Sequence, residues 1–358
     1  MKLNILASFL LFFNVVIFAQ IPTGYYNNAD GKSGYELKTA LYNIIKGHTQ
    51  QSYTSLWTHF KTTDKKSNGT VWDMYSDVPG GTPAYVYIFV EDQCGNYSGE
   101  GSCYNREHSW PKSWFDDGYP MYTDLFHLYP TDGYTNGKRG NYPFGEVDSP
   151  TWTSTNGSKL GNNSTDGYSS LVFEPIDEYK GDFARSYFYM ATRYENVISS
   201  WVNNTGASQI LDGSNEKVFK DWQLQLLFKW HNNDPVSDKE INRNNDVYGI
   251  QNNRNPFIDH PEYVALIWTT ETSVKNNSLE DFNLYPNPSN GIITITGNFN
   301  DSENILSFYN NLGQLVYRIN KPNFTQSQVN ISHLSKGVYY LKIKAKNKQF
   351  TTKKVILH

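Results

Sequence analysis

The 358-residue sequence has few cysteines, few charged residues and no internal apolar run long enough to cross a membrane. Charged residues make up 18% and aromatic residues 16% of the chain, which excludes intrinsic disorder, because disordered chains are highly charged and poor in aromatic residues. A coiled coil is excluded by the 15 Pro, the 26 Gly and the lack of a long heptad repeat. We therefore expect a globular protein, and its length favours two domains.

The scarcity of cysteine points to one structural use. Met1-Lys2 and the apolar stretch 5–19 are typical of a secretory signal peptide, with a buried N-terminal helix as the alternative. Because exported proteins meet oxidising surroundings, we predict a disulfide between Cys94 and Cys103, with two free thiols as the alternative. No further ligands lie at the spacing that a zinc finger requires.

The net charge of −4 hides an asymmetry along the chain. Residues 280–358 carry nine Lys or Arg and four Asp or Glu, a net charge of +5, whereas residues 1–279 carry 22 and 31, a net charge of −9. An acidic main body argues against bulk electrostatic affinity for nucleic acid. Any nucleic-acid chemistry in this body would need a local basic patch and a metal cation.

Residue periodicity predicts an α+β domain. Apolar residues at helical spacing predict helices at 35–48, 181–194 and 216–230, and the aromatic and β-branched segment 85–90 predicts a strand. Residues 91–170 are rich in Gly, Asn, Pro and Asp, and long irregular segments within a compact domain are usually functional.

A polar segment separates this domain from a second one. Beyond it, short alternating segments at 292–296, 306–309, 315–319, 338–345 and 351–357 predict the strands of a small all-β sandwich. The predicted organisation is a signal peptide at 1–20, the α+β domain at 21–270, a linker at 271–281 and the β-sandwich at 282–358.

The residues with the clearest chemical potential lie within the loop-rich segment. Glu107-His108 occurs in REHSWPKSWF, and Asn136 and Arg139 occur in YTNGKRGN. A neutral imidazole, with an ordinary pKa of about 6.5, suits the removal of a proton from water. Glu and Asn oxygens suit a hard cation such as Mg²⁺, and a guanidinium suits a phosphate oxygen. This combination is what metal-assisted phosphodiester hydrolysis requires.

Backbone geometry restricts how these residues can meet. Adjacent residues in a regular strand point to opposite faces, so Glu107 and His108 must lie at an irregular strand end, which the nearby Pro111 favours. Asn136 and Arg139 share one helix face if Thr131 caps a helix there, although Asn136-Gly137 also fits a turn.

The chain resembles the endonuclease I family, whose members are secreted or periplasmic nucleases. The resemblance rests on REHSWPKSWF, DLFHLYP and NGKRGN, on YYNNADGKSGYELKTALYNIIKGH before them, and on FEPIDEYKGDFARSYFYM and NRNPFIDHPEYV after them. It covers about residues 24–268 and implies a His-Me finger (ββα-metal) core with added helices and long loops. It also implies that His108 is the general base and that Glu107 and Asn136 bind Mg²⁺, with Ca²⁺ or Mn²⁺ as alternatives.

Two departures from the family pattern affect this assignment. Some members carry a phosphate-stabilising Arg after the His motif, but none lies between Glu107 and Asp124. We therefore assign that task to three other residues: Arg139 as a catalytic residue, and Lys112 and Arg185 as substrate-binding residues. Asn252 stands where the family often has Gly, which is a tolerated change because Asn adopts left-handed backbone readily.

Other candidate residues have simpler explanations. His127, in the apolar LFHLYP segment, is expected to be buried and hydrogen-bonded so that it orients the site. His231 and His260 are expected at the surface, with substrate contact as the alternative. Most Tyr and Trp side chains are expected in the core, although base stacking is an alternative use.

The C-terminal segment resembles a second known element. LYPNPSNG, YNNLGQLV, LSKGVYYLKIK and KKVILH are similar to the sorting domain of the type IX secretion system. The resemblance implies export by way of the periplasm, contact with the secretion machinery and removal of the domain. A small adhesive or carbohydrate-binding sandwich is the alternative.

These observations predict a secreted, monomeric, Mg²⁺-dependent endonuclease without marked sequence preference. By the resemblance, it cleaves DNA and RNA and leaves 5′-phosphate ends. The alternatives are a ribonuclease-preferring member and a non-catalytic extracellular protein that binds nucleic acid or glycan.

Overall fold

The computed structural model describes residues 21–272, 282–299, 304–310, 314–322, 324–345 and 352–358. The predicted signal peptide 1–20 and most of the predicted linker lie outside the described residues. The chain divides between Glu271 and Thr272 into two compact units. Within the described ranges, no helix is both long enough and apolar enough to span a membrane.

The N-terminal unit has the predicted α+β architecture. Its longer helices are α1 (Gly34–Ile45), α2 (Leu56–Thr63), α3 (Gly133–Arg139), α4 (Lys180–Arg193), α5 (Asp221–Asn233), α6 (Asp238–Gln251), α7 (Pro256–Asp259) and α8 (Glu262–Thr272). Its strands are β1 (Tyr104–His108), β2 (Leu128–Asp132), β3 (Val147–Thr153), β4 (Lys159–Asn163) and β5 (Leu171–Glu174). Strands β1 and β2 form an antiparallel pair, and β3, β4 and β5 form a separate antiparallel sheet.

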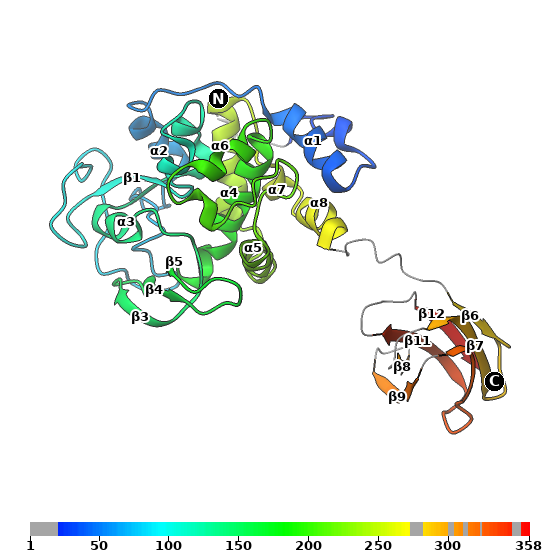
Figure 1. Ribbon diagram of the computed structural model, residues 1–358. Helices are drawn as coiled ribbons and strands as arrows, with labels where there is room; N and C mark the ends of the chain where they lie inside the picture. Colours follow the sequence, from blue (N-terminus) through cyan, green and yellow to red (C-terminus); the bar gives the residue numbers. More distant parts are fainter. Residues whose placement is uncertain (1–20, 273–281, 300–303, 311–313, 323, 346–351) are drawn as a thin grey trace, which may run out of the picture. The chain divides into compact units, whose positions relative to one another are not determined.

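Helix α4 is the centre of this unit, with the other helices around it (Figure 1). Every residue of α4 is buried. The surrounding core is rich in aromatic side chains, and Trp110, Trp230 and Trp268 are almost completely buried, as predicted for core residues. The helices predicted at 35–48 and 181–194 are confirmed as α1 and α4. Helix α5 begins later than predicted, because Val218 has a positive φ of 71° and Phe219 bridges to Leu211.

The strand predicted at 85–90 is wrong. Tyr87 is buried while Val86 and Ile88 are each 49% exposed, so the alternation of a strand is present. The segment has no strand beside it, however, and the carbonyl of Tyr87 accepts a single bond from the amide of Val71. Extended sequence propensity without a pairing partner gives an extended loop.

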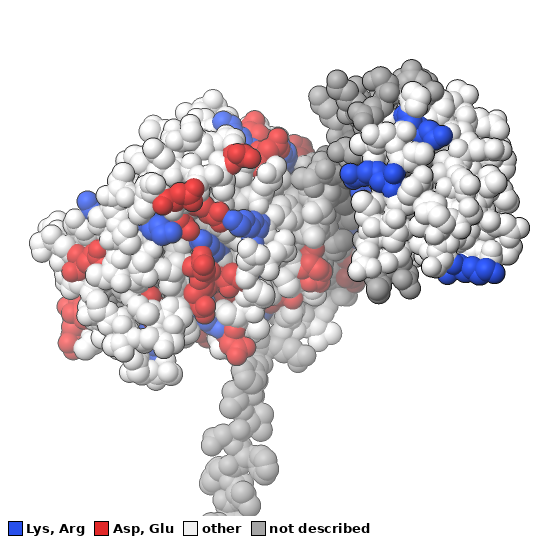
Figure 2. Space-filling view, turned by 90° about the horizontal axis from the view of Figure 1, so that it is seen from below, with Lys and Arg blue, Asp and Glu red and all other residues white. Residues whose placement is uncertain are grey.

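The C-terminal unit is the predicted all-β sandwich. Its strands are β6 (Asn283–Tyr285), β7 (Ile292–Phe299), β8 (Asn304–Asn310), β9 (Leu315–Lys321), β10 (Phe324–Asn330), β11 (Gly337–Ala345) and β12 (Lys353–Leu357). They form two antiparallel sheets, ordered β10-β7-β6 and β12-β11-β8-β9, around one apolar core. Strands β6 and β10 were not predicted. On the face seen in Figure 2, the described part of this unit displays Lys and Arg, in line with its basic composition.

Candidate active site

Strands β1 and β2 and helix α3 bring the predicted chemical residues together. Glu107 pairs with Tyr129 and His108 with Leu128 across the two strands, and α3 follows β2 without an intervening loop. Asn136 lies on α3. All three predicted residues, His108, Glu107 and Asn136, line one cavity of about 240 Å³. His108 is the last residue of β1, so the pair lies at a strand end as the geometry required.

The turn from β2 into α3 is fixed by Asp132, which caps the helix in place of the predicted Thr131. Its Oδ1 accepts the amide of Thr135 at 2.6 Å, and its Oδ2 accepts bonds from the Tyr87 hydroxyl and the Gly101 amide. Thr131 is wrong as the cap because it is still paired within β2. A fully satisfied cap positions the first turn of α3, and with it Asn136.

His108 is held as a neutral proton acceptor. Its Nε2 lies 3.1 Å from the carbonyl oxygen of Tyr122, and because a carbonyl only accepts, Nε2 carries the proton. The lone pair is therefore on Nδ1. Burial lowers the pKa of His108 well below its ordinary value, and the neighbouring His127 lowers it further. Both effects favour the neutral ring that a general base requires.

Glu107 has one oxygen engaged and one available. The Tyr75 hydroxyl donates to Oε1 at 2.9 Å, and Nε of Arg139 lies 3.6 Å from the same oxygen. No described residue donates a hydrogen bond to Oε2. Burial raises the pKa of Glu107, against the opposing charge of Arg139. A cation beside Oε2 would offset the cost of burying this carboxylate.

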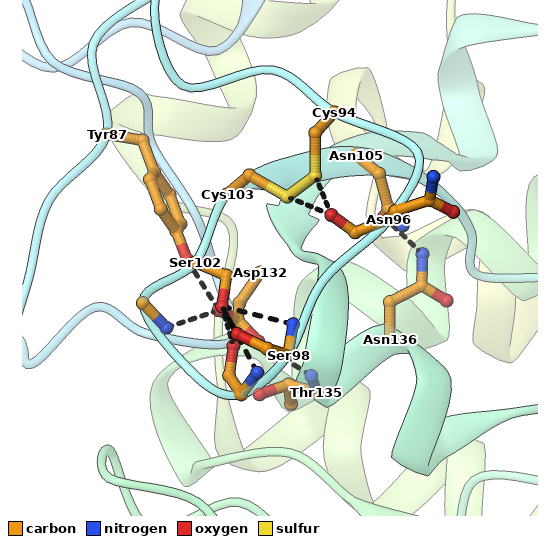
Figure 3. Close-up of a disulfide and its surroundings, with 12 residues drawn as sticks. Tyr87, Cys94, Asn96, Ser98, Ser102, Cys103, Asn105, Asp132, Thr135 and Asn136 are labelled. Carbon is orange, nitrogen blue, oxygen red and sulfur yellow. Dashed lines mark hydrogen bonds between the residues drawn. A yellow bond between two sulfur atoms is a disulfide. The ribbon is translucent and has the colours of Figure 1, made fainter.

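Asn136 is oriented by a neighbour on β1 (Figure 3). Its Nδ2 donates to Oδ1 of Asn105 at 2.6 Å, which leaves Oδ1 of Asn136 as an acceptor. Together with Glu107, this gives two oxygen donors to one cavity. Within the described part of the chain, no cluster of three or more His, Cys, Asp and Glu residues suited to a metal occurs. Two donors of this kind fit a hard cation that keeps most of its water, as Mg²⁺ does.

Arg139 lines the cavity but differs from its predicted phosphate-binding role. It is 1% exposed, and its terminal nitrogens donate to the carbonyls of His108 (3.3 Å) and Ser109 and to the Tyr187 hydroxyl (3.3 Å). These bonds hold the backbone on which the His108 side chain is mounted. The position therefore suits a residue that orients the base.

The two predicted substrate-binding residues have different positions. Lys112 lines the cavity, is 48% exposed at its side chain and lies 3.0 Å from Asp117. Arg185 is fully buried on α4, and its guanidinium pairs with both oxygens of Glu240. Arg185 lies outside the cavity, so substrate binding does not fit its position.

Arg106 is the cavity residue that sequence reasoning missed. Its guanidinium lies over the rings of Tyr53 (3.5 Å) and Trp57 (4.4 Å), and Nη1 donates to the Tyr53 carbonyl at 2.9 Å. We searched for a phosphate-binding Arg only after Glu107. The two-residue period of a strand places Arg106 on the same face as His108, and that signal was available in the sequence.

The other histidines have structural roles. His127 is buried, as predicted, and its Nε2 donates to the Met121 carbonyl at 2.7 Å. His231 was predicted at the surface, which is wrong: it is 9% exposed, because it packs behind α4 and its Nε2 bonds to the Pro261 carbonyl at 3.1 Å. His260 is half-buried, 3.0 Å from Glu262.

The predicted disulfide between Cys94 and Cys103 is confirmed, directly before β1 (Figure 3). The loop that it closes reaches α3 through Tyr97. A Cβ atom added to Gly137 would lie 2.1 Å from the Tyr97 hydroxyl, and one added to Gly133 would lie 2.8 Å from its ring. The two glycines therefore let the loop pack closely against the helix that carries Asn136.

We expect the Cys94→Ser/Cys103→Ser variant to unfold more easily. A closed loop of about ten residues contributes roughly 2.7 kcal/mol to the free energy of unfolding in the chain-entropy model. Denaturant unfolding with and without reductant measures the effect. Reductant should destabilise the wild type and leave the double variant unchanged. Equal stability of the two proteins without reductant would contradict the prediction.

Comparison with known proteins agrees with this geometry. The family model described as Endonuclease I matches residues 33–262, and the one described as a secretion system C-terminal sorting domain matches residues 283–358. An extracellular ribonuclease of Bacillus amyloliquefaciens is 36% identical over 249 residues, which are 68% of this chain and 78% of that protein.

Two further relatives extend the comparison. An extracellular ribonuclease of Bacillus subtilis (strain 168) is 36% identical over 251 residues, 68% of this chain and 78% of that protein. Endonuclease-1 of Buchnera aphidicola subsp. Baizongia pistaciae is 27% identical over 136 residues, 38% of this chain and 46% of that protein. The chain therefore belongs to the endonuclease I family and is a secreted nuclease that carries a C-terminal sorting domain.

Proposed function

We propose that this nuclease is a Mg²⁺-dependent endonuclease that hydrolyses phosphodiester bonds of RNA and DNA without marked sequence preference. The observation that carries the proposal is the convergence of His108, Glu107 and Asn136 in one cavity, each with a free atom of the required kind. A non-catalytic binding protein would have no need of all three.

In the proposed mechanism, each protein group has one task. Nδ1 of His108 takes a proton from the attacking water, while the carbonyl of Tyr122 keeps the ring in the required tautomer. Arg139 fixes the backbone beneath the base, and Arg106 and Lys112 face the substrate phosphate. Glu107 and Asn136 would hold Mg²⁺, which neutralises charge on the phosphate and the leaving oxygen. Departure of the 3′-oxygen leaves a 5′-phosphate.

A preference for RNA is the second candidate. It is favoured by the two relatives named extracellular ribonucleases, whose similarity extends over much more of this chain than that of Endonuclease-1. Values of kcat/KM for single-stranded RNA and DNA of one sequence distinguish the candidates, and analysis of the product ends tests the direction of cleavage. Products with 3′-phosphate or cyclic phosphate ends would contradict the mechanism.

Removing residues 282–358 is expected to stop export without changing nuclease kinetics. The described residues of this unit have their own core, and every proposed active-site residue lies before it. Nuclease activity in the medium and in cell extracts measures export. The alternative is a substrate-recruiting module, because its basic composition attracts phosphates. A salt-sensitive rise in KM for long RNA after truncation would favour that alternative.

A further inference from the structure

A second cavity lies on the other side of the segment that holds His108. It has a volume of about 510 Å³ and is lined by residues of α1, of the end of α4 and of the turn before β2. Its charged lining residues are Lys46 and Arg193, and no Asp or Glu lines it. By contrast, a cavity of about 400 Å³ beside β5 is lined by five carboxylates. The Lys46–Arg193 cavity is therefore the one suited to an anion.

Arg193 is a buried cation with unused donors. It is 7% exposed, and its Nε donates to Nδ1 of His48 at 2.9 Å. Its terminal nitrogens form no hydrogen bond with any described residue. Burying a guanidinium without an anionic partner is costly. The other strongly buried arginines of this unit each lie near a carboxylate: Arg139, Arg185, Arg243 and Arg254.

A row of aromatic rings connects this cavity with the active site. Tyr119, which is 51% exposed, lines the second cavity, and its ring lies 5.4 Å from that of Tyr122. The Tyr122 ring lies 5.1 Å from His108 and 4.6 Å from Tyr53. The carbonyl of Tyr122 also accepts the bond that orients His108. The wall between the two cavities is thus one short aromatic segment.

We propose that the Lys46–Arg193 cavity is a subsite for single-stranded nucleic acid next to the bond that is cleaved. Arg193 and Lys46 bind a backbone phosphate, and the exposed ring of Tyr119 stacks on the adjacent unpaired base. The subsite rests on the proposed function, since the strand enters it from the active site. Bases paired inside a duplex cannot stack on Tyr119, so single strands are preferred.

The test measures binding of a ten-nucleotide single-stranded RNA to the full-length chain. His108→Ala serves as the background so that the RNA stays intact, and fluorescence anisotropy gives Kd. Adding Tyr119→Ala is expected to weaken binding about tenfold, the order of one base stack. Tyr119→Phe, which keeps the stacking ring, is expected to bind as the background does.

The cationic half of the subsite is tested by charge removal. Lys46→Gln is expected to weaken binding and to lower the salt dependence by about 0.7 in the slope of log K against log salt concentration. Lys229→Gln, in the cavity with five carboxylates, is the matched control and should change neither. Arg193→Lys should bind more weakly even where Arg193→Gln fails to fold.

The outcomes are distinct. Equal Kd for the Tyr119→Ala and background proteins would overturn the subsite and leave the proposed function intact. Loss of binding in Lys46→Gln alone would indicate a site for free phosphate and would also overturn the stacking role. If the wild type cleaves neither RNA nor DNA, the proposed function fails, and the binding measurement still decides whether the subsite exists.

Discussion

His108→Ala is expected to lower kcat by about 10²–10⁴-fold, the usual contribution of a general base. The ring is neutral because burial lowers its pKa, and its Nδ1 lone pair is left by the bond between Nε2 and the Tyr122 carbonyl. Removing the ring leaves water without a proton acceptor in the cavity. The measurement is kcat on single-stranded RNA at saturating Mg²⁺.

A control separates lost chemistry from lost structure. His260→Ala removes a half-buried histidine that lies outside the cavity, and it should keep wild-type kcat. Circular dichroism and thermal unfolding should show that His108→Ala remains folded. Unchanged turnover of a folded His108→Ala variant would remove His108 from the mechanism.

Glu107→Gln and Asn136→Ala are expected to impair the use of Mg²⁺ far more than the binding of nucleic acid. Each variant removes or weakens one of two oxygen donors in a shell that is otherwise water. Because losing a supporting metal contact typically costs about 10–100-fold, losing a direct ligand should cost at least as much at a fixed Mg²⁺ concentration. Titrating activity with Mg²⁺ should show a weaker response or a lower plateau.

The choice of substitution and control matters here. Glu107→Gln keeps the shape of a side chain that also lies 3.6 Å from buried Arg139, so it disturbs packing less than Ala would. Asn105→Ala removes the bond that orients the Asn136 amide without removing either donor, and its defect should be smaller. Wild-type Mg²⁺ titrations for both Glu107→Gln and Asn136→Ala would contradict the ligand roles.

Sequence patterns were informative where local chemistry determines structure. The helical period predicted α1 and α4, and the Glu-His and Asn-Gly motifs identified residues that the structure places in one cavity. The same reasoning missed α6, because that helix buries polar side chains. Glu240, Arg243, Asn244 and Gln251 are buried there through ion pairs and hydrogen bonds that no apolar period reveals.

The roles of arginines were the least predictable feature, because they depend on partners distant in sequence. Arg185 was assigned to substrate but pairs with Glu240, and Arg139 was assigned to phosphate but bonds to the backbone at His108. Arg106 and Arg193 drew no attention in the sequence. A guanidinium takes its function from what lies opposite it, and only the folded chain specifies that.

Metal removal tests the central claim most directly. Full-length protein is incubated with plasmid, linear DNA and RNA in Mg²⁺, then with excess EDTA, and then with Mg²⁺ restored. If His108, Glu107 and Asn136 form one metal-assisted hydrolytic site, nucleic acid is cut within the strand in Mg²⁺, cleavage stops in EDTA, and it returns with the metal. Undiminished cleavage in EDTA, or no cleavage of any of the three substrates in Mg²⁺, would contradict the account.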